Sequence, residues 1–303
     1  MTASAPPVQP GPISRWVLAA RVRTLPAAVV PIVVGASCVR PASINVLTTV
    51  LCAVVALALQ IGTNYANDYS DGVRGTDAVR VGPFRLTASR LVTPSAVRNS
   101  AIASFGVAAV AGCALAALTA WWLIIVGATA IAAGWFYTGG PRPYGYYGFG
   151  ELFVFVYFGL VATAGTAFVQ HGHVPTNAWF LGAALGAAAC ALLEANNLRD
   201  IDGDRAAGKR TLAARLGRKR GALLYGFFAA VAALAGAWGG AGYSWWALVL
   251  LALIDGIYHS PVRVAFSEKS GRDLLVLLVQ SARAQLLLGV VLTVAVWTIH
   301  WRV

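Results

Sequence analysis

Residues 44–77, INVLTTVLCAVVALALQIGTNYANDYSDGVRGTD, join an apolar run to a group of acids. Residues 44–66 carry no charge and are long enough to cross a bilayer, which takes roughly 20 mainly apolar residues. Asp68, Asp71 and Asp77 follow directly. This stretch therefore predicts a membrane helix with a polar functional segment at one end, because ionisable groups beside a membrane span usually serve function.

Apolar runs of this length recur along the 303-residue chain. Hydrophobic residues make up 58% of it and charged residues only 11%, with a mean hydropathy of +0.70. A soluble domain is about a quarter charged, so the composition excludes a soluble globular protein. We predict an all-α polytopic membrane protein with nine spans, at residues 24–40, 44–66, 98–118, 120–138, 151–170, 178–198, 220–239, 243–260 and 276–299.

The basic residues predict the orientation of the chain. All Lys and Arg residues except Arg40 and Arg302 fall on one side of the predicted spans. The positive-inside rule places this side, with the N-terminus and the long loops, in the cytoplasm, and the C-terminus outside. Because these residues lie in short loops, the net charge of +12 does not indicate nucleic acid as a partner. All eleven acids also lie on or near this side, and a cation site is the simplest explanation.

The N-terminal part of the sequence predicts a peripheral segment. Residues 1–14 are proline-rich, without a basic start or a compact apolar core, so we expect a flexible tail rather than a cleaved signal. Residues 14–23 predict an interfacial helix that leads into a membrane helix kinked by Pro26 and Pro31. The four cysteines lie far apart inside apolar segments and are expected to be buried without forming disulfides.

The acidic stretch 64–77 predicts a ligand site if the first helix continues through it. Helical spacing then puts four polar residues on one face: Asn64, Asn67, Asp68 and Asp71. Carboxylates so placed repel one another unless a cation neutralises them. The alternative is a solvated loop in which Asp and Gly form turns.

A second acidic stretch, EANNLRDIDGDRAAGKR at 194–210, repeats Asn67 and Asp71 as Asn196 and Asp200, 129 residues later. On a helix, Asp200 and Asp204 share a face from which Asp202 points away. Carboxylate ligands suit Mg²⁺, which takes a few of them together with water and substrate phosphates, and the interleaved Arg and Lys suit phosphate oxygens. The two stretches together predict a diphosphate site; the alternative for the second is a salt-bridged surface helix.

These residues resemble the UbiA superfamily of intramembrane aromatic prenyltransferases, whose signatures are an N-D-x-x-D motif and a later D-x-x-x-D motif. Residues 67–71 and 200–204 match them. The strings NDYSDGVRGTD, RVGPFRLTASRLVTP, YTGGPRPYGYYGFGE and NNLRDIDGDRAAGKRTLAARLG are similar to the menaquinone-pathway branch, which prenylates 1,4-dihydroxy-2-naphthoate. In one departure, Gly75 stands where the family often has a further Asp, and Asp77 follows two residues later. For Asp77 we therefore expect only a water-mediated contact with the metal.

The resemblance implies a single UbiA-like domain over residues 1–303, in which nine helices surround a central cavity that opens sideways to lipid. Cytoplasmic loops at 67–97 and 199–219 would cap the cavity. The implied reaction transfers a polyprenyl group from polyprenyl diphosphate to 1,4-dihydroxy-2-naphthoate, with loss of carboxylate and diphosphate, and gives a demethylmenaquinone at the bacterial cytoplasmic membrane.

The resemblance also implies the residues of the site. Two Mg²⁺ ions, for which Mn²⁺ can substitute, would be held by Asn67 and four catalytic aspartates: Asp68, Asp71, Asp200 and Asp204. The expected substrate-binding residues are Asn64, Asn67, Arg74, Tyr137, Arg142, Glu151, Asn196, Asn197 and Lys209.

The segment 137–151, YTGGPRPYGYYGFGE, is a third candidate. We expect Tyr137 in the cavity wall and Arg142 as a phosphate clamp, whereas Glu151 either positions the aromatic acceptor or merely starts the next helix. Tyr146 and Tyr147 suit either the site or an interfacial aromatic belt.

Other features of the sequence leave alternatives open. His171 and His173 predict a solvated turn, because no carboxylate or thiolate is near them in the sequence, and Asp255, His259 and Arg283 have no assigned role. A CDP-alcohol phosphotransferase would share the D-x-x-D-G of residues 68–72 but needs later residues that are missing. A secondary transporter would carry its ionisable groups near the bilayer midplane. Ubiquinone-type and heme-type prenyltransferases, the tail length and the oligomeric state stay open.

Overall fold

The computed structural model describes residues 11–75 and 85–300, and within these ranges the chain is helical with connecting turns. The α-helices are α1 (Pro12–Ala19), α2 (Pro26–Ala36), α3 (Val46–Arg74), α4 (Pro94–Leu118), α5 (Leu123–Phe136), α6 (Gly150–Val154), α7 (Ala162–His171), α8 (Thr176–Arg199), α9 (Ile201–Ala206), α10 (Leu212–Ala241), α11 (Trp246–Ala265) and α12 (Leu275–Ala295). The π-helix η4 (Phe155–Val161) joins α6 to α7, and the short 3₁₀ turns include η1 (Val22–Thr24) and η3 (Tyr144–Tyr147). The prediction of an all-α membrane protein is confirmed.

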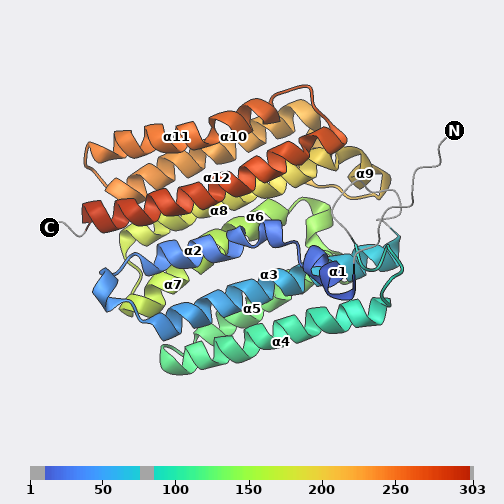
Figure 1. Cartoon of the computed structure of the whole chain (residues 1–303), viewed down its shortest axis with the longest axis horizontal. Helices are drawn as coiled ribbons and strands as arrows, with labels where there is room; N and C mark the ends of the chain where they lie inside the picture. The colour runs from blue at the N-terminus through green and yellow to red at the C-terminus, as the bar shows by residue number, and fades with distance from the viewer. Residues whose placement is uncertain (1–10, 76–84, 301–303) are drawn as a thin grey trace.

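Seven helical segments of the described chain are long and apolar enough to span a membrane. Two further segments fall where spans are predicted, but α2 has only 11 residues and α5 only 14. At 1.5 Å per residue they measure about 16 and 21 Å, less than the roughly 30 Å of a bilayer core. Both lie alongside the long helices (Figure 1). The helical bundle is thus established, with seven candidate spans in place of the nine predicted.

The first described helices turn before they enter the bundle. Helix α1 begins at Pro12, so the end of the segment predicted to be a flexible tail is helical, and residues 1–10 lie outside the described ranges. Arg21 then adopts a left-handed conformation (φ 54°) and turns the chain into η1 and α2. Pro31 lies inside α2, as the sequence predicts.

Helix α8 forms the centre of the bundle. It packs against α10, α12 and η4, and most of its membrane-length window is buried. Glycines allow the closest approach: a Cβ on Gly159 of η4 would lie 2.4 Å from the Cα of Gly186 of α8. In Figure 1, α8 lies between the group α10–α12 and the group that contains α2, α3 and α7.

The acidic stretches lie at the same end of the bundle as α1 and α9 (Figure 1). Helix α3 continues through the first stretch to Arg74 and ends at Gly75, whose φ of 73° suits glycine. Asn64, Asn67, Asp68 and Asp71 are therefore on one helix, and all four are buried. This outcome excludes the alternative of a solvated loop for residues 64–74; Asp77 lies outside the described residues.

Candidate active site

Asp68 fixes the segment that precedes α4. Its two carboxylate oxygens accept hydrogen bonds from the backbone N–H groups of Leu86 (2.8 Å) and Thr87 (2.9 Å). The helix and the segment pack so closely that a Cβ on Gly72 would lie 2.3 Å from a methyl carbon of Thr87. A buried carboxylate with two N–H donors is well stabilised, so Asp68 holds residues 85–87 against the end of α3.

Asp71 is the centre of a buried ionic cluster. Its carboxylate lies 3.0 Å from Lys209 Nζ and 3.4 Å from the Arg85 guanidinium, and it accepts a 2.6 Å hydrogen bond from the Tyr146 hydroxyl. Lys209 Nζ also lies 4.7 Å from the centre of the Tyr146 ring. Three segments that are distant in sequence meet at this one carboxylate.

Two residues of this cluster extend the predicted site. Tyr146, left open between the site and an aromatic belt, belongs to the cluster, whereas Tyr147 is exposed. Arg85 was not among the predicted residues, because nothing in its spacing separates it from the other basic residues of the segment. One feature of the sequence could have pointed to Arg85 as a site residue. It lies in the string RVGPFRLTASR, two residues before Thr87, and this string carries part of the family resemblance.

The second acidic stretch is a helix with a break. Asp200 ends α8 and precedes α9, and its carboxylate pairs with the Arg199 guanidinium at 2.7 Å. Asp204 accepts a hydrogen bond from the Thr211 hydroxyl (3.3 Å), and its backbone carbonyl accepts one from Lys209 N–H (2.7 Å). Asp200 and Asp204 are buried and Asp202 is exposed. The predicted separation of Asp202 from the pair is thus observed, although the helix is not continuous.

The segment 137–149 connects the two acidic stretches. The Thr138 hydroxyl donates a hydrogen bond to the Asn67 side chain (2.7 Å), and Arg210 N–H donates one to the Tyr146 carbonyl (2.7 Å). Arg74 donates to the backbone carbonyls of Thr138 and Gly140. Its guanidinium thus holds the segment in place, and it also lies 5.3 Å from the centre of the Tyr146 ring, at the edge of the cluster. Arg142 is exposed, and the structure does not bring it to the cluster.

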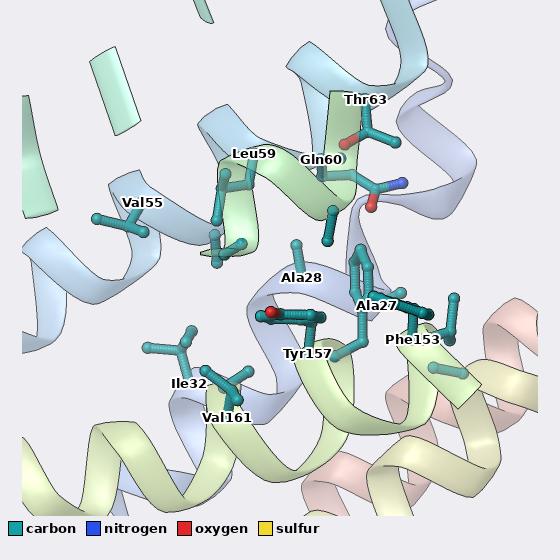
Figure 2. A pocket seen from close by; sticks show the side chains of 18 of the residues that line it. Ala27, Ala28, Ile32, Val55, Leu59, Gln60, Thr63, Phe153, Tyr157 and Val161 are labelled. Carbon is teal, nitrogen blue, oxygen red and sulfur yellow. The ribbon is translucent and has the colours of Figure 1, made fainter. Parts of the chain in front are cut away.

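A cavity of about 290 Å³ reaches Asn67, one helical turn before Asp71 on α3. Its polar end is lined by Asn64, Asn67, Tyr137 and Asn196. On α3 its lining runs from Asn67 to Cys52, a distance of about 22 Å at helical rise, and the far end is apolar. Figure 2 shows Gln60 and Thr63 of α3 on one side of this cavity, with Phe153 and Tyr157 on the other.

Aromatic rings form one wall of the cavity. Tyr137 contacts Tyr144 edge to face (5.5 Å between centres), Tyr144 stacks on Phe153 (4.0 Å), and Phe153 stacks on Tyr157 (6.3 Å). Burial raises the pKa of the Tyr144 phenol, and its hydroxyl donates to the Ala133 carbonyl (2.9 Å). The wall therefore offers uncharged aromatic faces, which attract cations by about 0.5–2 kcal/mol.

The other predicted residues have the following places. The Asn64 amide donates to the Ala20 carbonyl (2.9 Å), and the Asn197 amide donates to Glu151 (2.8 Å), which is buried just behind the cavity wall. Three ionisable residues without an assigned role are exposed and line no part of the cavity: Asp255, His259 and Arg283. The predicted solvated turn is wrong for His171, which is half-buried at the end of α7 with its Nε2 2.7 Å from the Cys38 carbonyl oxygen, whereas His173 is exposed.

The chemistry of these donors fits Mg²⁺. Among the described residues no three His, Cys, Asp or Glu side chains stand close enough to hold a metal ion by themselves. Mg²⁺ does not need such a cage, because it usually binds one or two carboxylates and completes its shell with water and substrate phosphates. Four buried carboxylates stand near the end of the cavity that Asn67 and Asn196 line, with Lys209 and Arg85 beside one of them, and they can supply such ligands: Asp68, Asp71, Asp200 and Asp204.

Comparisons with known proteins identify the family. The model of the UbiA prenyltransferase family matches residues 28–276. The chain belongs to this family. It is 52% identical to a 1,4-dihydroxy-2-naphthoate octaprenyltransferase of Mycobacterium tuberculosis, over 72% of this chain and 75% of that protein. It is 37% identical to the enzyme of the same name from Escherichia coli, over 67% and 68% of the two chains.

Solved structures show the same fold. A UbiA homolog from Archaeoglobus fulgidus bound to GPP and Mg²⁺ aligns with a TM-score of 0.69 at 14% identity, over 94% of this chain and all of that one. A homolog from Aeropyrum pernix K1 aligns with a TM-score of 0.64 at 16% identity, over 90% and 96%. The UbiA fold therefore holds for nearly the whole chain.

Proposed function

We propose that this protein transfers a polyprenyl group from polyprenyl diphosphate to 1,4-dihydroxy-2-naphthoate, with decarboxylation, and forms a demethylmenaquinone. The observation that carries the proposal is the 52% identity to the Mycobacterium tuberculosis octaprenyltransferase of that substrate. An ionic cluster at the mouth of an apolar cavity supports it, because the donor has a charged head and an apolar tail.

Basic and aromatic residues of the site have separate proposed roles. Lys209 and Arg85, held beside Asp71 at the mouth, supply positive charge for diphosphate oxygens. The tail enters the apolar part of the cavity, and the wall that contains Tyr144, Phe153 and Tyr157 faces the allylic carbon where positive charge develops. Exclusion of water by the helices keeps this cation from hydrolysis.

The proposed metal ligands are Asp68, Asp71, Asp200 and Asp204, with Asn67 nearby. Mg²⁺ at these carboxylates would neutralise the diphosphate and improve it as a leaving group. Two structures of a UbiA homolog from Archaeoglobus fulgidus, one bound to GPP and Mg²⁺ and one bound to DMAPP and Mg²⁺, support this choice of metal. Two ions are proposed, as is substitution by Mn²⁺.

The proposed location is the bacterial cytoplasmic membrane, with nine spans, the N-terminus and the active-site loops in the cytoplasm and the C-terminus outside. The near one-sided distribution of Lys and Arg supports the orientation. The short helices α2 and α5 complete the nine passes if they cross the bilayer beside the longer helices.

The direct test is prenyl transfer by the purified chain in lipid nanodiscs. We expect a decarboxylated prenyl naphthoquinol from 1,4-dihydroxy-2-naphthoate and labelled polyprenyl diphosphate, and no product from 4-hydroxybenzoate. Product from 4-hydroxybenzoate alone would assign the chain to the ubiquinone type. Excess chelator should abolish turnover and Mg²⁺ should restore it best, whereas full activity in chelator would overturn the metal site.

A further inference from the structure

Two buried carboxyl groups lie behind the cavity wall and outside the ionic cluster. Glu151 of α6 is 5% exposed and Glu194 of α8 is fully buried. Glu151 accepts the hydrogen bond from the Asn197 amide, whereas neither oxygen of Glu194 has a hydrogen-bond partner among the described residues. Cys190 and Asn197, one turn before and one turn after Glu194 on α8, both bond to Glu151, so Glu194 lies on the face of α8 that Glu151 contacts. A buried acid pair of this kind calls for either a cation or a proton.

The packing favours a proton. A Cβ on Gly221 of α10 would lie only 2.9 Å from Glu194 Oε1 and 2.7 Å from a Leu198 methyl carbon, so helices α8 and α10 close tightly over the carboxyl. Cys190, one turn earlier on α8, directs its thiol to the Glu151 backbone carbonyl (3.1 Å). No basic side chain is bonded to either carboxyl in the described part of the chain. The pair therefore balances its charge by sharing a proton.

Tyr137 connects this acid pair to the cavity. Its side chain lines the cavity, and a Cβ on Gly150, the residue before Glu151, would lie 3.5 Å from the Tyr137 hydroxyl oxygen. Gly150 thus packs against the Tyr137 ring and hydroxyl, and Glu151 is the next residue along the chain. Within the described chain the Tyr137 hydroxyl makes no hydrogen bond. The hydroxyl therefore lies beside both the cavity and the start of α6, where Glu151 is buried.

We propose that Glu151, paired with Glu194, is a positioning residue that acts through Tyr137 and holds the proton of the acceptor's ring hydroxyl during prenyl transfer. This inference rests on the proposed function. The hydroxyl proton passes to Tyr137, and the Tyr137 proton passes to Glu151. At the same time the ring carbon next to this hydroxyl, which carries the carboxylate, bonds to the allylic carbon, and the bond between the allylic carbon and the diphosphate oxygen breaks. The product is a β-keto acid: the bond between its ring carbon and the carboxylate breaks, CO₂ leaves, the electron pair restores the aromatic ring, and the proton returns to the ring oxygen.

The first test is Glu151→Gln, whose amide oxygen can still accept from Asn197. We expect kcat to fall on the order of 100-fold, as is usual for loss of a proton-transfer group, with unchanged KM for both substrates. The matched control is Glu268→Gln, an exposed residue, which should keep wild-type kcat. Tyr137→Phe, which keeps the ring contact with Tyr144, should reproduce the loss if Glu151→Gln does not fold.

The second test separates proton holding from a structural role. An acceptor with a more acidic ring hydroxyl, such as a chlorinated dihydroxynaphthoate, needs less help with its proton, so it should raise kcat of Glu151→Gln at least tenfold relative to wild type. Wild-type kcat retained by Glu151→Gln, or an equal loss with both acceptors, would overturn the inference. Absence of transfer by the wild-type chain would instead overturn the proposed function.

Discussion

At the scale of single residues, Asp71 and Asp202 differ in what surrounds them. Asp71 is buried between Lys209, Arg85 and Tyr146, whereas Asp202 is exposed on α9. Removing one anionic ligand from a site that neutralises a diphosphate costs transition-state stabilisation, commonly about 100- to 1000-fold in rate. We expect Asp71→Asn to lose activity on this scale and Asp202→Asn to keep most of it. Equal losses in a prenyl-transfer assay would contradict the assignment of ligands.

Arg85 and Arg90 offer a matched pair within one short segment. The Arg85 guanidinium is buried beside Asp71, and Arg90 is exposed. A hydrogen bond to a charged group contributes about 1.5–3 kcal/mol, so Arg85→Ala should raise KM for the prenyl diphosphate roughly tenfold or more. Arg90→Ala should leave it unchanged. Steady-state kinetics at saturating acceptor would measure both, and an unaltered KM in Arg85→Ala would remove Arg85 from the site.

At the scale of elements, the contact between η4 and α8 depends on glycine. A Cβ on Gly159 would meet the backbone of Gly182 and Gly186 at 2.4–2.7 Å, whereas nothing lies within 4 Å of a Cβ on Gly165 in the next part of the same span. Overpacking of a core typically costs 1–3 kcal/mol. We expect Gly159→Ala to lower the Tm in detergent by several degrees and Gly165→Ala to preserve it. Equal Tm values would show that the two helices can separate without cost.

At the scale of the whole molecule, the two ends of the bundle should face different compartments. Tyr243, after α10, is almost fully exposed, and the part of α10 after its break at Gly217, residues 218–241, separates it from α9 by about 36 Å at helical rise. In a variant without the four native cysteines, Tyr243→Cys should react with an impermeant maleimide in intact spheroplasts. Asp202→Cys should react only after permeabilisation, since the positive-inside rule places it in the cytoplasm. The reverse pattern would invert the proposed orientation.

The sequence by itself determined the helical membrane class and the faces of single helices. The positions of the spans follow from the length of the apolar runs, because each crossing of the bilayer requires a continuous apolar segment of a set length. The shared face of Asn67, Asp68 and Asp71 follows from helical spacing, and α3 bears it out. Apolar length does not predict where a helix ends. The apolar runs at α2 and α5 are evident in the sequence, but both helices are shorter than these runs, because their ends depend on neighbouring turns.

Only the tertiary structure decided which helices share a site. Arg85 and Tyr146 reach Asp71 from 14 and 75 positions away, and Glu151 meets Asn197 across 46. No local period encodes such pairs, because they depend on how helices pack, which here is set by glycine contacts and by Asp68 binding backbone N–H groups. For the same reason Arg74 and Arg142, which the family resemblance implied as substrate-binding residues, have different surroundings: Arg74 bonds backbone carbonyls beside the Tyr146 ring, and Arg142 lies at the surface.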